Sequence, residues 1–195
     1  MMHVLLIHAG PTPWDLDDRI TGAENLPLAP QALAPVTSII DSYEQFHPDA
    51  IFCPRGNEAC QEVAKLMADR SGQKIRYETA FAEFKLGLWE GLTRDQFRHR
   101  YPTVTQQWQD NPTSVVPPEG ESLAEVVDRL YGPLEKIYRK FDGRKVVFVL
   151  RPLVMAIIGG ILRAQPMNAF SADLAIRRSH DEIESSDFPT RERIG

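Results

Sequence analysis

Short, unbroken apolar runs alternate with amphipathic stretches along most of the chain. Four of the runs, over residues 3–7, 50–53, 75–77 and 145–150, have the length and the β-branched content of buried strands. Because the runs over 3–7, 50–53 and 145–150 are apolar at consecutive positions, rather than at every second position, they predict a sheet that is buried on both faces. One further edge strand is predicted at 173–176, where the apolar pattern is weaker.

Helical periodicity fills the intervals between these runs. Apolar residues recur at helical spacing over 33–43 and over 59–67, which predicts one helix in each interval. Thr93 and Ser122 each precede a glutamine or glutamate by three residues, the spacing of a capping box, so we expect a short helix after Thr93 and a long one after Ser122. Strands that alternate with helices in this way predict a three-layer α/β/α fold around a mostly parallel central sheet.

The chain length and the fading of the apolar pattern indicate the domain boundaries. With 195 residues the chain is long enough for one substantial domain, which we place at residues 1–176. Residues 80–120 are predicted to form a loop-rich helical insertion over the pocket. Residues 177–195 are mostly polar and are predicted to form a polar tail with poor order.

Composition narrows the class of protein. The formal net charge is 22 − 27 = −5, whereas a protein that binds nucleic acid without regard to sequence is normally basic. No apolar stretch approaches the ~20 residues that cross a bilayer, and the first residues lack a basic segment and a cleavage site. Cys53 and Cys60 have neither a disulfide framework nor a zinc spacing. These features predict a cytoplasmic protein with reduced thiols, no metal and no membrane or nucleic-acid partner.

The residues that follow the predicted strands are candidates for a binding site, because ligands of an open parallel sheet bind beyond the carboxyl ends of its strands. Arginine side chains among them suit the phosphate and carboxylate groups of an anionic ligand. The sequence therefore predicts an anion site at this edge of the sheet. The residues that define it are His8 and Gly10 after the first run, Arg55 after the second, Glu83 after the third and Arg151 after the fourth.

Motifs in the same regions resemble those of a known family, and they occur in the family's order. They read GPTPWD at 10–15, RITG at 19–22, EFKLGLWEG at 83–91 and PPEGES at 117–122. Together they resemble the histidine phosphatase superfamily, which includes phosphoglycerate mutases and related cofactor-independent phosphatases. The resemblance implies a phosphoglycerate mutase-like fold, a small anionic or phosphorylated ligand, and no cofactor.

The resemblance does not extend to all the catalytic residues of the family. The family uses a phosphorylated histidine, a second histidine, two arginines that hold the phosphoryl oxygens and a glutamate that supplies the proton. Such a site stabilises an anionic transition state by positioning and positive charge. Alignment of the motifs implies that Glu83 alone is retained in place and type. The other positions carry Ala9 for the nucleophile, His8 for the first arginine, Gly56 or Asn57 for the second arginine, Arg151 for the second histidine, and Asp15 for an asparagine.

These replacements favour an inactive or vestigial enzyme that still binds an anion. Arg151 can hold an anion by a bidentate fork. Asp15 opposes this, because a like charge at ~4 Å costs ~4 kcal/mol at an effective dielectric of ~20. The alternative for Arg151 is an ion pair with Glu83 or Asp15 that closes the pocket. The predicted ligand-binding residues are Arg151, Arg19, Arg55, Thr12, Asp15 and Gly10.

Three functional hypotheses follow. The first is a binding or regulatory protein without turnover. The second is an active phosphomonoester phosphatase that uses His8 and Glu83 in an altered pocket. Because successive strand residues face opposite sides, His8 reaches that pocket only if the strand end is bulged. The third is a scaffold, or a subunit of a homo-oligomer, whose pocket is inert.

Overall fold

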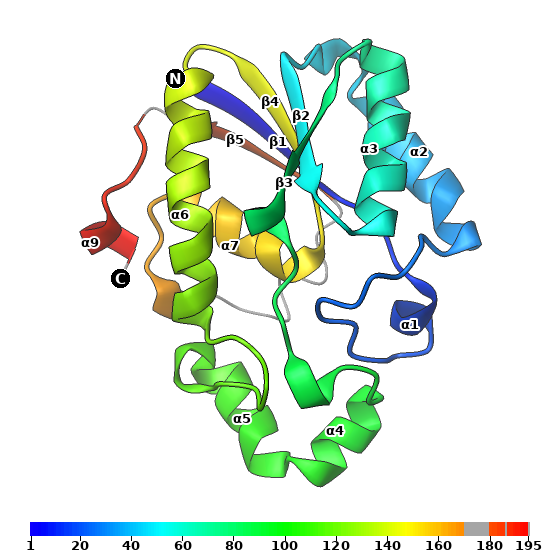
Figure 1. Ribbon diagram of the computed structural model, residues 1–195, viewed down its shortest axis with the longest axis vertical. Helices are drawn as coiled ribbons and strands as arrows, with labels where there is room; N and C mark the ends of the chain where they lie inside the picture. Colours follow the sequence, from blue (N-terminus) through cyan, green and yellow to red (C-terminus); the bar gives the residue numbers. More distant parts are fainter. Residues whose placement is uncertain (170–179, 186, 195) are drawn as a thin grey trace.

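A five-stranded sheet lies at the centre of the computed structural model, which describes residues 1–169, 180–185 and 187–194 (Figure 1). The strand order is β3-β2-β4-β1-β5. The first four strands in this order run parallel, and β5 is antiparallel to β1. The prediction of a three-layer fold with a mostly parallel central sheet is therefore confirmed. The strands are β1 (Met2–His8), β2 (Ala50–Pro54), β3 (Ile75–Glu78), β4 (Lys145–Leu150) and β5 (His180–Ser185).

Helices cover both faces of the sheet (Figure 1). On one face Val4 and Leu6 of β1 share a core with α6 and α7, and on the other Leu5 and Ile7 share a core with α2 and α3. Because successive strand residues point to opposite faces, a strand that is enclosed on both sides has to be apolar throughout. In the described ranges no helix is long and apolar enough to cross a membrane. The α-helices are α1 (Pro13–Leu16), α2 (Leu33–Ser42), α3 (Glu58–Ser71), α4 (Arg94–Arg100), α5 (Pro102–Asp110), α6 (Leu123–Lys140), α7 (Pro152–Leu162) and α9 (Arg191–Ile194).

Helices α4 and α5 lie together beyond one end of the sheet (Figure 1). Helix α4 begins with the predicted capping box, in which the Thr93 hydroxyl accepts from the Gln96 N–H at 3.1 Å. Helix α5 was not predicted, because only Val104 and Trp108 among its nine residues are apolar, too few for a clear period. Both side chains pack against the main core. Short 3-10 helices occur at Pro30–Ala32, Glu44–Phe46, Thr79–Phe81, Gly87–Trp89, Pro112–Ser114 and Met167–Ala169.

The end of the chain differs from the predicted polar tail over residues 177–195. Strand β5 pairs with β1 along its whole length, and its Ile183 is 5% exposed within the core. Helix α9 buries Ile194 against the same core. The tail prediction was wrong for these two elements, because β5 contains a single apolar residue and an edge strand of this kind resembles a polar loop in the sequence. The edge strand predicted at 173–176 lies outside the described residues.

Candidate functional site

The end of β1 forms the first wall of the candidate site. The strand stays in register with β4 up to His8, which pairs with Leu150, and the Ala9 N–H donates to the Leu150 carbonyl at 2.9 Å. The strand end therefore has no bulge. Gly10 follows with φ +91°, and a Cβ at this position would lie 2.8 Å from Val36 Cγ2. Only glycine fits this turn without displacing its neighbours.

A buried ion pair between Arg151 and Asp15 occupies the centre of the site. Arg151 directly follows β4 and is 2% exposed. Its Nη2 donates to Asp15 Oδ2 at 2.7 Å, and its Nη1 donates to the Gly10 carbonyl at 2.7 Å. The sequence predicted either Glu83 or Asp15 as a possible partner of Arg151, and the partner in the structure is Asp15. The charge of Arg151 is thus balanced by a carboxylate of its own chain.

Three further hydrogen bonds fix the Asp15 carboxylate. The backbone N–H and the hydroxyl of Thr12 each donate to Oδ2 at 2.7 Å, and the Thr21 hydroxyl donates to Oδ1 at 2.8 Å. Burial alone would raise the pKa of Asp15, but the Arg151 guanidinium and the bonds from Thr12 outweigh it and hold this pKa below its ordinary value. Thr21 lies in the RITG motif, yet the sequence analysis assigned it no role.

Glu83 lies at the first turn of α7. Its side chain is 4% exposed, and its Oε1 accepts from the N–H of Phe84 at 2.6 Å and of Val154 at 3.0 Å. Its Oε2 accepts from the Leu153 N–H at 3.0 Å. Burial raises the pKa of Glu83, although these hydrogen bonds and Arg151 act in the opposite direction. Both carboxylate oxygens are therefore bound to backbone N–H groups, two of them at the start of a helix that would otherwise lack acceptors.

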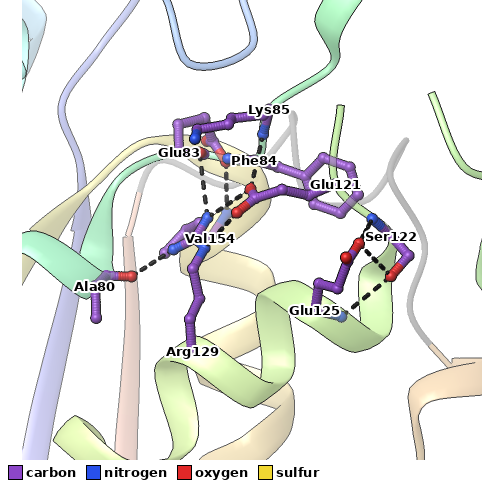
Figure 2. A network of polar contacts seen from close by, with 9 residues as sticks. All are labelled: Ala80, Glu83, Phe84, Lys85, Glu121, Ser122, Glu125, Arg129 and Val154. Atoms are coloured by element: carbon purple, nitrogen blue, oxygen red, sulfur yellow. Dashed lines mark hydrogen bonds and ion pairs between the residues drawn. The ribbon is translucent and has the colours of Figure 1, made fainter. Parts of the chain in front are cut away.

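An arginine on α6 fixes the segment that carries Glu83 (Figure 2). Arg129 Nε and Nη2 donate to the two oxygens of Glu121 at 3.0 and 3.1 Å, which makes a bidentate pair. The same guanidinium donates to the carbonyls of Ala80 and Glu83, the latter at 3.2 Å. Glu121 in turn accepts from the Lys85 N–H at 3.1 Å. Arg129 thus joins three chain segments. In the sequence, Arg129 follows the PPEGES motif by about two helical turns, and this spacing could have identified it as a partner of Glu121.

The other two predicted arginines lie apart from the ion pair. Arg19 Nη1 donates to the Gly91 carbonyl at 2.8 Å, so this side chain links the first loop to the insertion. Arg55 is exposed, and its guanidinium carbon lies 5.7 Å from the centroid of the Tyr77 ring. Within the described part of the chain, neither side chain forms a hydrogen bond or ion pair with Asp15, whose partners are Thr12, Thr21 and Arg151.

The turn between β2 and α3 adds no positive charge to the site. Gly56 has φ +78°, and the Asn57 side chain caps α3 by accepting from the Cys60 N–H at 2.9 Å. Burial raises the pKa of Cys53 to about 12 and also raises that of Cys60, so both thiols are protonated. Over residues 1–169, 180–185 and 187–194, no group of three or more His, Cys, Asp or Glu side chains is arranged to hold a metal ion.

His8 is close enough to the ion pair to feel both of its charges although the strand end has no bulge, so the predicted need for a bulge was wrong. Burial and the charge of Arg151 lower the pKa of His8 to about 3, against an opposing effect of Asp15. The imidazole is therefore neutral at neutral pH. Its Nε2 is buried and has no hydrogen-bond partner among the described residues.

The sequence was compared with known protein families. It matches the histidine phosphatase superfamily (branch 1) over residues 4–176. The chain belongs to the histidine phosphatase superfamily. The recognition made from the four motifs is thus confirmed.

Individual members of the superfamily are distant from this chain. Phosphoserine phosphatase 1 of Hydrogenobacter thermophilus is 22% identical over 164 residues, which are 82% of this chain and 77% of that protein. The uncharacterized phosphatase PhoE of Bacillus subtilis is 26% identical over 180 residues, 90% of this chain and 87% of that protein. Among solved structures, a mycobacterial glucosyl-3-phosphoglycerate phosphatase in complex with VO3 has a TM-score of 0.77 at 22% identity, covering 85% of this chain and 84% of that one. The structural likeness supports the same fold.

The motifs predict that Arg151 stands at the position of the superfamily's second histidine and Asp15 at that of an asparagine. In this chain the two side chains bind each other at 2.7 Å.

We expect His8 to make this superfamily domain less stable as the pH falls from 8 to 5. The pKa is about 3 in the folded state and 6.5 in the reference state, so the unfolded chain binds more protons in this interval. The contribution of neutral His8 to the free energy of unfolding is fully present above pH 6.5. It is lost progressively below that pH, by about 2 kcal/mol at pH 5. Denaturant titrations at the two pH values measure the loss.

The variant H8N should show a loss that is smaller by about that amount, whereas H99N, at an imidazole that is 80% exposed, should behave as the wild type does. The depressed pKa of Asp15 acts only below this pH interval, and any contribution of Glu83 is common to wild type and variant. Equal losses in wild type and H8N would contradict the assignment.

Proposed function

We propose that this chain is a non-catalytic member of the histidine phosphatase superfamily, a pseudoenzyme that keeps the fold without phosphatase turnover. The observation that carries the proposal is Ala9, which directly follows β1 at the position predicted for the nucleophile and is fully buried. A methyl side chain has no lone pair, and so it cannot accept a phosphoryl group. Loss of a nucleophile has cost other enzymes on the order of a million-fold in rate.

The state of Glu83 supports the same proposal. A general acid has to reach the leaving-group oxygen, within about 2.6–3.2 Å or through one water molecule. Both oxygens of Glu83 are instead engaged by three backbone N–H groups, at 2.6–3.0 Å. Retention of this residue is explained by its role at the start of α7, without a role in proton transfer.

One observation favours the alternative, an active phosphatase that uses His8 and Glu83. His8 is neutral, and its Nε2 carries no partner among the described residues, as a nucleophilic imidazole requires. It lies close enough to Arg151 for that charge to lower its pKa. The same atom is buried, however, so a phosphate could reach it only after the residues around it had moved.

Hydrolysis of a generic aryl phosphate distinguishes the two functions. The assay compares wild type with H8A and with E83Q, all purified in the same way. We expect the three proteins to release the aryl alcohol at one common rate, equal to that of buffer or of a trace contaminant. Robust turnover by the wild type that both substitutions abolish would establish the active phosphatase and remove the proposal.

The action of such a domain would lie in binding. We propose a cytoplasmic binding or regulatory protein, and a scaffold or homo-oligomer subunit is the alternative. The reason is that the fold and the Arg129–Glu121 network are both retained (Figure 2), although the predicted site has no nucleophile. Size-exclusion chromatography with light scattering measures the oligomeric state directly.

A further inference from the structure

Four donors from three residues surround the Asp15 carboxylate as they would a bound oxyanion, and the two from Thr12 also belong to the capping box of α1. Asp15 accepts from the backbone N–H of Thr12, from the hydroxyls of Thr12 and Thr21, and from the Arg151 guanidinium, each at 2.7–2.8 Å. Backbone N–H groups, hydroxyls and arginine N–H groups are the donors by which proteins bind the oxygens of a free phosphate or carboxylate. The ligand in this arrangement is a side chain of the protein itself.

Burial differs between the two members of the pair. Arg151 is 2% exposed as a side chain and Asp15 27% exposed. Of the two side chains, Asp15 is therefore the one that meets solvent, and Arg151 is almost inaccessible behind the surface. The Arg151 Nε is also buried and without a hydrogen-bond partner in the described residues, so the guanidinium has one donor left for a further acceptor.

The segment that carries Asp15 is held against the insertion. The Ile20 N–H donates to the Leu92 carbonyl at 2.9 Å, and the Gly91 N–H donates to the Ile20 carbonyl at 2.8 Å. Arg94 forms an ion pair with Asp18 at 3.2 Å. Because these contacts fix the segment, the carboxylate meets Arg151 at a high effective concentration, which a free anion in solution does not match.

We propose that Asp15 is an internal ligand of this oxyanion site, an autoinhibitory contact that keeps free phosphate away from Arg151. The inference rests on the proposed function, since it explains how a phosphatase fold without turnover also avoids holding phosphate. Replacement of the carboxylate by an amide removes the like charge and leaves a neutral, weaker acceptor on the guanidinium, which an external dianion can displace. Repulsion between the Asp15 carboxylate and a phosphate ~4 Å away, at an effective dielectric of ~20, corresponds to about 1,000-fold in the affinity for phosphate.

Calorimetric titration with inorganic phosphate at neutral pH tests the proposal. The wild type should give no saturable binding at millimolar phosphate. D15N should bind at least 100-fold more tightly, and the double variant D15N/R151L should lose that binding. D17N is the matched control, because it makes the same charge change on the same segment, at a side chain that is 68% exposed. It should behave as the wild type does.

A folded D15N protein that does not bind phosphate would overturn the inference, and so would tight phosphate binding by the wild type. A second measurement requires no variant: the thermal midpoint of the wild type in phosphate should equal that in chloride of the same ionic strength. A rise specific to phosphate would also overturn the inference. The two proposals fail separately, because turnover of an aryl phosphate concerns only the function, whereas phosphate binding by D15N concerns only Asp15.

Discussion

The variant D15A should unfold about 3 kcal/mol more easily than the wild type, the size expected when one partner of a buried ion pair is removed. Arg151 is 2% exposed and would keep a buried charge without its ion-pair partner, with the Gly10 carbonyl as its remaining acceptor among the described residues and Glu83 as a nearby carboxylate. Thr12 and Thr21 would also lose the acceptor for their hydroxyls. Chemical denaturation at neutral pH measures the difference in the free energy of unfolding.

Two further variants make this prediction specific. D17A removes an exposed carboxylate two residues away and should change the stability by less than about 0.5 kcal/mol. The double variant D15A/R151M removes both charges and should recover most of the loss, because a buried pair replaced by apolar groups is often neutral. If D15A and D17A were equally stable, the ion pair would have no structural role.

The variant E83A should lower the free energy of unfolding by about 3 kcal/mol, because three backbone N–H groups would lose their buried acceptor. The donors belong to Phe84, Leu153 and Val154. E83Q keeps one acceptor oxygen and should lose about half as much. K85A, at an exposed neighbour, is the control and should remain close to wild type. A loss in E83A no greater than in K85A would show that the start of α7 does not depend on this carboxylate.

Local patterns in the sequence predicted most of the sheet and several helices. Strands β1, β2 and β4 were identified because a strand enclosed on both faces is apolar at nearly every position, whereas β3 (IRYE) is a short, partly exposed edge strand. The capping boxes at Thr93 and Ser122 marked the starts of α4 and α6, since both partners of a capping box lie within four residues. Strand β5 and helix α5 were not predicted, because an edge strand and a surface helix bury few side chains and so show little hydrophobic periodicity.

The candidate site was harder to predict, because it depends on contacts between distant residues. The sequence offered both Glu83 and Asp15 as partners of Arg151, and only the fold decides between them, since Asp15 lies 136 residues away. Glu83 instead accepts hydrogen bonds from backbone N–H groups at the start of α7, and a pattern of side chains in the sequence cannot predict such contacts. Arg19 and Arg55 were grouped with Arg151 by their positions after strands or motifs, yet their side chains turn to Gly91 and Tyr77.

The central claim is that this member of the histidine phosphatase superfamily carries out no phosphoryl transfer. The most direct measurement is the rate of aryl phosphate hydrolysis by the wild type beside H8A, under identical conditions. We predict that wild type and H8A hydrolyse the aryl phosphate at equal rates, and that both rates fall to that of buffer once any contaminating phosphatase has been removed. A wild-type rate that is at least a thousand-fold higher than that of H8A would contradict the account.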